Sequence, residues 1–304
     1  MNRRGFLGKS VSLAGAAAAL IPGAVTEAAA QAGAPHKYKL RYAPRVGFLQ
    51  GLSVPQQLEV YAQNGFLQFE FNGLPSQSAE EVKAIRKKMD ERNMSMGVFV
   101  VNRGGWKPTA MGDRGGHKEF LEDCKRAVDL HNVIRNECAT VTSGLQVPHL
   151  TFAQQTANAV EVLKRASDIV AGTKLVLVLE PLNWKVDHAG YFVSYIEHAG
   201  EIIGTVDRPN VKILFDIYHQ QITEGNLINH IRHYFELIGY FQVGDVPGRK
   251  EPYTGEINYQ GVFKAIYDLN YKGIIGMEHG LSEPDMPGLM KCFEAYKKAD
   301  DFEA

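Results

Sequence analysis

The chain has 304 residues, of which 45% are hydrophobic and 22% are charged, and this is enough apolar material for one large core. Its formal net charge of −1 provides no overall attraction for nucleic acid or for an anionic membrane, so we expect no nucleic-acid partner. Its three cysteines are too few and too scattered for a disulfide framework or a cysteine-rich zinc site.

The first thirty residues have the successive parts of an export signal. The pair Arg3-Arg4 precedes a moderately apolar run over residues 11–25, and small residues follow at Ala28–Ala30. This order resembles the twin-arginine signal, so we predict a signal peptide over residues 1–30, export to the periplasm by the twin-arginine route, and a linker over residues 31–36. An ordinary secretory signal or a retained anchor helix is the alternative. Because Pro22 interrupts the apolar run and the run is short for a span, we expect no stable membrane anchor.

From residue 37 onward, short apolar runs alternate with amphipathic runs of helical period. The predicted strands, in chain order, are Tyr38–Tyr42, Leu67–Phe71, Met96–Val101, Cys138–Thr142, Leu175–Glu180, Val211–Asp216, Tyr240–Val243 and Gly273–Glu278. The predicted helices are Ser78–Arg92, Lys118–Arg135, Thr151–Val170, Tyr191–Thr205, Asn226–Leu237, Tyr259–Leu269 and Gly288–Lys298. In the first of these helices, Ser78 is the expected N-cap and Glu81 completes a capping box.

The alternation of strands and helices indicates a parallel sheet. Eight such units over residues 37–300 have the size of a single-domain (β/α)8 TIM barrel, an α/β fold. The competing fold is a doubly wound sheet, whose nucleotide-binding form carries a G-x-G-x-x-G fingerprint after the first strand. Residues 41–52 contain no such fingerprint, so we predict the barrel. The long loop Gly104–Gly116 can cover its mouth.

Four polar residues end the last four predicted strands. Glu180, Asp216, Gln242 and Glu278 follow one another at intervals of 36, 26 and 36 residues, each close to the length of one strand–helix unit. Because the carboxyl ends of barrel strands meet on one face, these side chains should converge there. Three carboxylates that close cannot all stay ionised without a cation, and oxygen ligands favour one hard divalent ion, Mn²⁺ or Mg²⁺. The alternative is that the acids pair with Lys, Arg or helix N-termini at the rim.

The segments around these positions resemble the hydroxypyruvate isomerase family, which lies within the xylose isomerase-like barrels together with ketose 3-epimerases. The similarity runs through most of the chain after residue 30, and its motifs are FLQFEF at Glu70, the GGW loop, LEPLN at Glu180, FDIYHQQ at Asp216, QVGDVPGRKEPYTGEINY from Gln242 and MEHG at Glu278. The resemblance implies that the metal ligands are Glu180, Asp216, Gln242 and Glu278, and that Glu180 and Glu278 are also catalytic. It implies substrate contacts for His219 and Arg249, and it suggests a homo-oligomer.

These residue types suit proton transfer next to a carbonyl. A metal chelated by a carbonyl and the adjacent hydroxyl polarises the C–H between them, so one glutamate can remove the proton while the metal holds the ene-diolate, and the other glutamate serves the second carbon or face. His219 can bind a substrate oxygen or orient a glutamate, and Arg249 suits a substrate carboxylate. We therefore predict a divalent-metal-dependent isomerase or epimerase acting on a small sugar or hydroxy-keto acid, hydroxypyruvate-like or ketose-like.

Two other functions use the same residues. A lyase on 3-keto-glycosides would abstract the same proton and expel a neighbouring group, and an exported barrel could bind metal and sugar without turnover. Retention of both glutamates argues against the second of these. The chain also departs from the family pattern, because its fourth strand reads CATVTSG where the family usually shows Asn. Export is the larger departure, since hydroxypyruvate is a cytoplasmic metabolite, so the reaction class is better supported than the substrate.

Overall fold

A computed structural model describes residues 36–102 and 110–303 of the chain. Its strands are β1 (Arg41–Pro44), β2 (Gln68–Phe69), β3 (Ser95–Met96), β4 (Cys138–Val141), β5 (Val176–Leu179), β6 (Val211–Asp216), β7 (Ile238–Gln242) and β8 (Ile274–Met277). Its α-helices are α2 (Val54–Gln63), α3 (Ala79–Arg92), α4 (His117–Ile134), α5 (Phe152–Val170), α6 (Ile196–Val206), α7 (Ile217–Thr223), α8 (Leu227–Tyr234), α9 (Tyr259–Asp268) and α10 (Met286–Asp300). Short 3₁₀ helices lie at Leu74–Ser76, Arg114–Gly116 and Phe235–Leu237.

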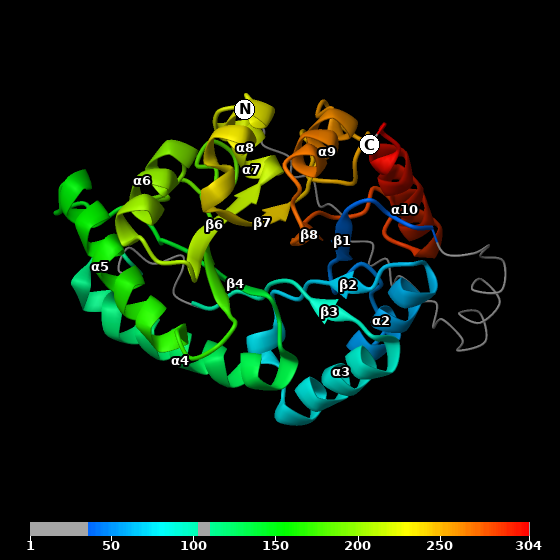
Figure 1. Cartoon of the computed structure of the whole chain (residues 1–304), viewed down its shortest axis with the longest axis horizontal. Helices are drawn as coiled ribbons and strands as arrows, with labels where there is room; N and C mark the ends of the chain where they lie inside the picture. The colour runs from blue at the N-terminus through cyan, green and yellow to red at the C-terminus, as the bar shows by residue number, and fades with distance from the viewer. Residues whose placement is uncertain (1–35, 103–109, 304) are drawn as a thin grey trace, which may run out of the picture.

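The strands form a parallel sheet that curls inside a ring of helices (Figure 1). Six strands are joined in the order β1-β8-β7-β6-β5-β4, and β2 pairs separately with β3. Backbone hydrogen bonds connect the two sheets at both edges, for example from Glu70 N to Pro44 O at 3.2 Å and from Thr140 N to Phe99 O at 2.8 Å. A strand overlaps each of the eight predicted runs, but β1 begins three residues later than predicted and β3 shares only Met96 with its predicted run. The expected continuous eight-stranded ladder is replaced by a curled six-stranded sheet, a half-barrel, and a two-stranded piece.

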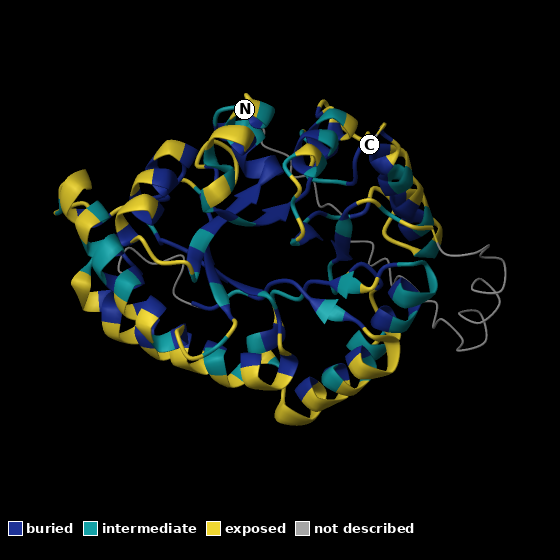
Figure 2. Ribbon diagram, in the orientation of Figure 1, coloured by how far each residue is buried: buried dark blue, intermediate teal, exposed yellow. Residues whose placement is uncertain are grey.

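The core lies between the sheet and the helices. Figure 2 shows buried strands and helices whose inner faces are buried and whose outer faces are exposed. In α5, the buried residues recur every three or four positions at Ala159, Val162, Leu163, Ala166 and Val170, as expected for one face of a helix packed on a sheet. The predicted capping box of α3 is confirmed, because Ser78 Oγ accepts from Glu81 N at 3.3 Å and Glu81 Oε2 accepts from Ser78 N at 2.8 Å.

The helix predictions fail at three places. Helix α6 begins at Ile196 rather than at Tyr191, because the backbone of Phe192 and Val193 donates to Gly144 O and Ser143 Oγ instead of entering a helix. Helices α2 and α7 were not predicted. Helix α7 starts directly after β6, where Asp216 caps it by accepting from Tyr218 N at 2.9 Å.

Three predictions lie wholly or partly outside the described residues: the export signal over residues 1–30, residues 31–35 of the predicted linker, and the segment 103–109 of the loop predicted to cover the mouth. Within residues 36–102 and 110–303, no helix combines the length and the apolar character needed to cross a membrane.

Candidate metal and active site

The four predicted ligands lie at the carboxyl ends of four adjacent strands. Glu180 follows β5 directly, Asp216 ends β6, Gln242 ends β7 and Glu278 follows β8. Parallel pairing places Asp216 opposite Gln242, and Gln242 opposite Gly276. The side chains of Glu180, Asp216 and Gln242 are buried, and that of Glu278 is 17% exposed. The strand order β8-β7-β6-β5 thus sets the two glutamates on the two sides of the Asp216–Gln242 pair.

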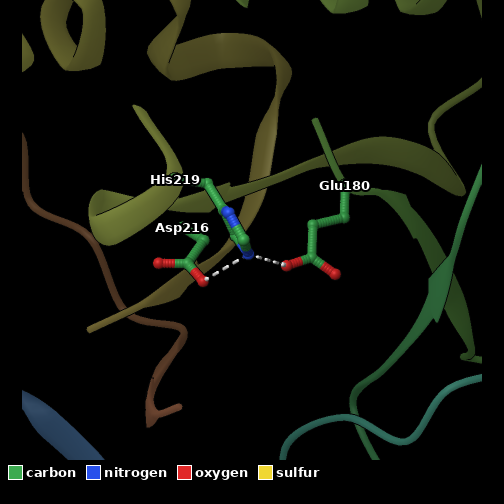
Figure 3. Close-up of side chains that lie close together, drawn as sticks. All are labelled: Glu180, Asp216 and His219. Carbon is green, nitrogen blue, oxygen red and sulfur yellow. Dashed lines mark ion pairs between the residues drawn. The ribbon is translucent and has the colours of Figure 1, made fainter. Parts of the chain in front are cut away.

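His219 lies between Glu180 and Asp216 (Figure 3). Its Nε2 is 3.8 Å from Glu180 Oε1 and 3.6 Å from Asp216 Oδ2. The other ring nitrogen, Nδ1, lies 3.2 Å from the backbone N of Asn183 and 2.7 Å from its Nδ2. A backbone N–H can only donate, so Nδ1 is the acceptor and the neutral ring carries its proton on Nε2. His219 is therefore arranged to donate into the site, which differs from the lone pair that a metal ligand must offer.

Arg249 reaches the same carboxylate from the loop after β7. Its Nη2 donates to Asp216 Oδ2 at 2.7 Å, and its guanidinium lies 4.7 Å from the centre of the Tyr218 ring. Its Nε is buried without a hydrogen-bond partner among the described residues. This guanidinium is mostly withdrawn from water and still has an unused donor, which is the state expected of a group that binds an acidic ligand.

Crowding perturbs the acids of this cluster. Burial and the charge of Asp216 raise the pKa of Glu180 well above its usual value. Burial also raises the pKa of Asp216 to about 6, although the Arg249 guanidinium opposes this shift. For Glu278, burial acts upward, but a hydrogen bond from Glu70 and nearby guanidinium groups outweigh it, so its pKa is lowered. A cation among these groups would favour their ionised forms.

Glu70 is a site residue that the sequence analysis did not assign. It follows β2, is fully buried, and accepts hydrogen bonds from Tyr240 Oη at 3.2 Å and from Gln242 Nε2 at 3.2 Å. Burial and the neighbouring charge of Glu278 raise its pKa well above the usual range. The sequence FLQFEF contains the pattern that would have identified Glu70, because an acidic residue follows an apolar run there as it does at Glu180, Asp216 and Glu278.

The donors fit a hard divalent cation. Glu180, Asp216 and Glu278 supply carboxylate oxygens, and Gln242 supplies an amide oxygen, Oε1, that is buried without a hydrogen-bond partner among the described residues. A buried carbonyl oxygen left unpaired costs about 1–3 kcal/mol, and a cation would satisfy it. The sequence-predicted ligand set is thus compatible with Mn²⁺ or Mg²⁺, whose preferred ligands are oxygens.

Comparison with known proteins assigns the family. Residues 58–296 match the family model described as xylose isomerase-like TIM barrel, so the chain belongs to that family and has its fold. The chain is 31% identical to the 2-oxo-tetronate isomerase of Cupriavidus necator over 224 residues, covering 72% of this chain and 84% of that protein. It is 30% identical to the hydroxypyruvate isomerase of Escherichia coli over 247 residues, covering 79% and 93%.

A further relative matches over a shorter stretch. The chain is 39% identical to the putative hydroxypyruvate isomerase of Xenopus laevis over 131 residues, which are 43% of this chain and only 48% of that protein.

Among solved structures, 3-keto-D-glucoside 4-epimerase from Escherichia coli superposes with a TM-score of 0.72 at 19% identity, covering 86% of this chain and 98% of the other. A protein described as IOLI with a bound zinc atom superposes with a TM-score of 0.68 at 17% identity, covering 86% and 96%. At these identities the two structures support the fold alone.

Proposed function

We propose that the chain is a divalent-metal-dependent isomerase or epimerase of a small hydroxy-keto compound, hydroxypyruvate-like or ketose-like. The observation that carries this proposal is the placement of Glu180 and Glu278 on the two sides of the Asp216–Gln242 pair, at the carboxyl ends of β5 and β8. The isomerase names of the relatives from Cupriavidus necator and Escherichia coli support the same reaction class.

Four residues would hold the ion: Glu180, Asp216, Gln242 and Glu278. When bound, a divalent ion polarises a carbonyl and so acidifies the neighbouring C–H. The two glutamates carry out the two proton transfers. One carboxylate accepts the proton from the carbon next to the carbonyl, and the other carboxyl group returns a proton to the adjacent carbon or to the opposite face.

The surrounding residues bind and orient the substrate. His219 donates from Nε2 to a substrate oxygen, because Asn183 occupies its Nδ1. Arg249, which lies beside Asp216, binds a substrate carboxylate or the oxygens of a ketose through its fork of N–H groups. Both contacts would fix the reacting C–H relative to the two glutamates, and such positioning is a large part of the catalytic advantage.

The test combines metal content with isotope exchange. The whole protein, purified without chelator, should contain about one divalent ion per chain by elemental analysis. Loaded with Mn²⁺ and incubated in deuterated water with hydroxypyruvate, a four-carbon 2-oxo acid or a ketose, it should place deuterium on the reacting carbon of at least one of them. Release of an eliminated group instead would identify a lyase and contradict the isomerase proposal.

Glu278→Gln is the matched variant. It keeps the length of the side chain and an oxygen ligand but removes the basic carboxylate, so turnover and exchange should fall by roughly 10²–10⁴-fold while metal still binds. Glu180→Gln should behave alike. If no divalent ion binds, or if the Glu278→Gln variant exchanges at the wild-type rate, the proposed mechanism is wrong.

We also propose export by the twin-arginine route, on the basis of the first thirty residues. Replacing Arg3 and Arg4 together by Lys should retain the precursor in the cytoplasm, since an ammonium group does not reproduce the planar fork of a guanidinium. Unimpaired export of that variant would favour the general secretory route.

A further inference from the structure

The carboxyl group of Glu70 lies inside the barrel, where it meets two polar groups of β7. Tyr240 Oη donates to Glu70 Oε2 at 3.2 Å, and Gln242 Nε2 lies 3.2 Å from Oε2 and 3.4 Å from Oε1. Tyr240 and Gln242 are two positions apart on one strand, so both side chains point to the same face of the sheet. Glu70 therefore receives both inward-facing polar groups at the end of β7.

Two glycines, one in β8 and one directly after β3, make room for this arrangement. A Cβ placed on Gly276 in β8 would lie 1.8 Å from Glu70 Oε2, and a Cβ on Gly97, directly after β3, would lie 2.1 Å from Tyr240 Oη. Real side chains do not approach that closely, so larger residues at these two positions would displace the Glu70 and Tyr240 groups. The barrel interior is thus shaped around the Glu70 carboxyl group and the phenol that supports it.

The contact with Glu70 determines which end of the Gln242 amide is available to a ligand. The amide nitrogen is a donor and has no lone pair to offer a cation, whereas the amide oxygen has two. Because Nε2 is engaged by Glu70, the oxygen is the free end, and Oε1 is buried with no hydrogen-bond partner among the described residues. A rotation of the amide by half a turn would put two oxygens against each other and present N–H groups to the ion.

We propose that Glu70 is a positioning residue that fixes the side-chain amide of Gln242 with its oxygen toward the metal. This inference rests on the metal site of the proposed function and assigns a role to a residue outside the ligand set. Partners that orient metal ligands in this way typically change metal affinity by about 10–100-fold when they are replaced.

The experiment measures Mn²⁺ affinity by isothermal titration calorimetry on the whole protein. In Glu70→Gln, the new amide can face Gln242 with either its oxygen or its nitrogen, so the orientation of Gln242 is no longer fixed. We expect Mn²⁺ binding to weaken about 10–100-fold. Asp300→Asn is the matched control, because Asp300 is also buried and accepts from a tyrosine hydroxyl, Tyr42 Oη, at 2.9 Å, but contacts none of the proposed ligands. The control should bind Mn²⁺ with wild-type affinity.

A double-mutant cycle separates the orientation of the Gln242 amide from other effects of Glu70. In the Gln242→Glu background both ends of the side chain at position 242 are oxygens, so adding Glu70→Gln should not weaken Mn²⁺ binding. The double variant Glu70→Gln, Gln242→Glu should therefore bind Mn²⁺ more tightly than Glu70→Gln alone. If Glu70 acts only through its hydrogen bond to Glu278, the Glu70→Gln change weakens binding equally in both backgrounds, and the proposal is overturned. Equal affinities of wild type and Glu70→Gln overturn it as well.

A second variant covers the case in which Glu70→Gln does not fold, as judged by circular dichroism. Glu70→Asp keeps the carboxyl group and withdraws the acceptor by one CH₂ group, so it should weaken Mn²⁺ binding in the wild-type background and not in the Gln242→Glu background. The two proposals fail in different ways. If the wild type does not bind Mn²⁺, the metal site itself is wrong, whereas a wild type that binds and a Glu70 variant of equal affinity contradict only the positioning role.

Discussion

Asn183 lies against one ring nitrogen of His219, with its backbone N at 3.2 Å and its Nδ2 at 2.7 Å from Nδ1. Asn183 lies in the loop after β5, and His219 lies in the first turn of α7. Their contact selects the tautomer of His219 and therefore decides that Nε2, which faces Glu180 and Asp216, carries the proton.

The first prediction reverses that selection. Asn183→Asp replaces the Nδ2 donor at 2.7 Å by a carboxylate oxygen, while the backbone N–H donor at 3.2 Å stays. The carboxylate is the nearer and the charged partner, so Nδ1 of His219 should gain a proton. The neutral ring would then carry its proton on Nδ1 and would have no Nε2–H to donate to the substrate, so kcat/KM should fall by roughly 10–100-fold, the worth of one charged hydrogen bond. Nitrogen-15 NMR of the histidine ring reports the tautomer directly. Asn229→Asp, on the exposed face of α8, is the control. An unchanged Nε2–H tautomer in Asn183→Asp would contradict the assignment.

The second prediction concerns the binding of a substrate carboxylate by Arg249. Arg249→Lys keeps the charge but loses the planar fork that can bind a carboxylate through two hydrogen bonds. For a 2-oxo acid, kcat/KM should fall by roughly 10–100-fold, and for a neutral ketose it should fall much less. Steady-state kinetics on both substrate types give the ratio. Equal losses on the two substrates would show that Arg249 acts mainly through Asp216, to which it donates at 2.7 Å.

The third prediction concerns the space beside Glu70. Gly276→Ala places a Cβ where Glu70 Oε2 lies and should lower the free energy of unfolding by about 1–3 kcal/mol, the usual cost of overpacking a core. Gly204→Ala in α6 is the matched control, because a Cβ there meets no heavy atom within 4 Å. It should be neutral or stabilise by about 0.4–1 kcal/mol. Urea denaturation measures both. A Gly276→Ala variant as stable as the control would show that the barrel interior is looser than this packing implies.

Sequence reasoning located the strands best where they are buried apolar runs. The predicted run Val211–Asp216 coincides with β6, because its residues are almost all buried and Asp216 lies at the carboxyl end of the strand. The same reasoning brought Glu180, Asp216, Gln242 and Glu278 to the ends of adjacent strands, which is where the structure places them. Periodicity and chain order carry this information, since each unit returns the chain to the same face.

Contacts between distant segments were not predictable in this way. Glu70 follows a strand of only two residues, and its partner Gln242 lies 172 positions later, so no local pattern reports the pair. The partner of His219 Nδ1 is a backbone N–H, which any residue provides. Helix α7 has seven residues, and its N-cap is a site residue, Asp216, so its start looked like a loop.

The last prediction concerns pH and the burial of His198 in α6. His198 is 7% exposed, and its ring packs on Phe152 and Phe192 with centroid distances of 4.4 and 5.0 Å. Its Nε2 is 3.0 Å from Thr156 Oγ1. Burial lowers the pKa of His198 from 6.5 to about 4. Between pH 6.5 and about pH 4, the unfolded chain binds a proton at His198 and the folded chain does not. The contribution of the neutral His198 ring to the free energy of unfolding is therefore fully present above pH 6.5 and is lost as the pH falls toward 4.

His198→Gln removes this proton uptake while keeping a group that can bond Thr156. The wild-type advantage in unfolding free energy over His198→Gln should therefore shrink by roughly 1–2 kcal/mol between about pH 7.5 and about pH 4.5, a value that discounts the full shift for partial solvent screening. Urea denaturation at the two pH values measures it. His149→Gln, whose side chain is 72% exposed in the wild type, is the control and should follow the wild-type slope. If His198→Gln keeps the same stability difference at both pH values, the ring does not hold its neutral form in the folded protein, and the acid sensitivity of the fold must come from its buried carboxyl groups.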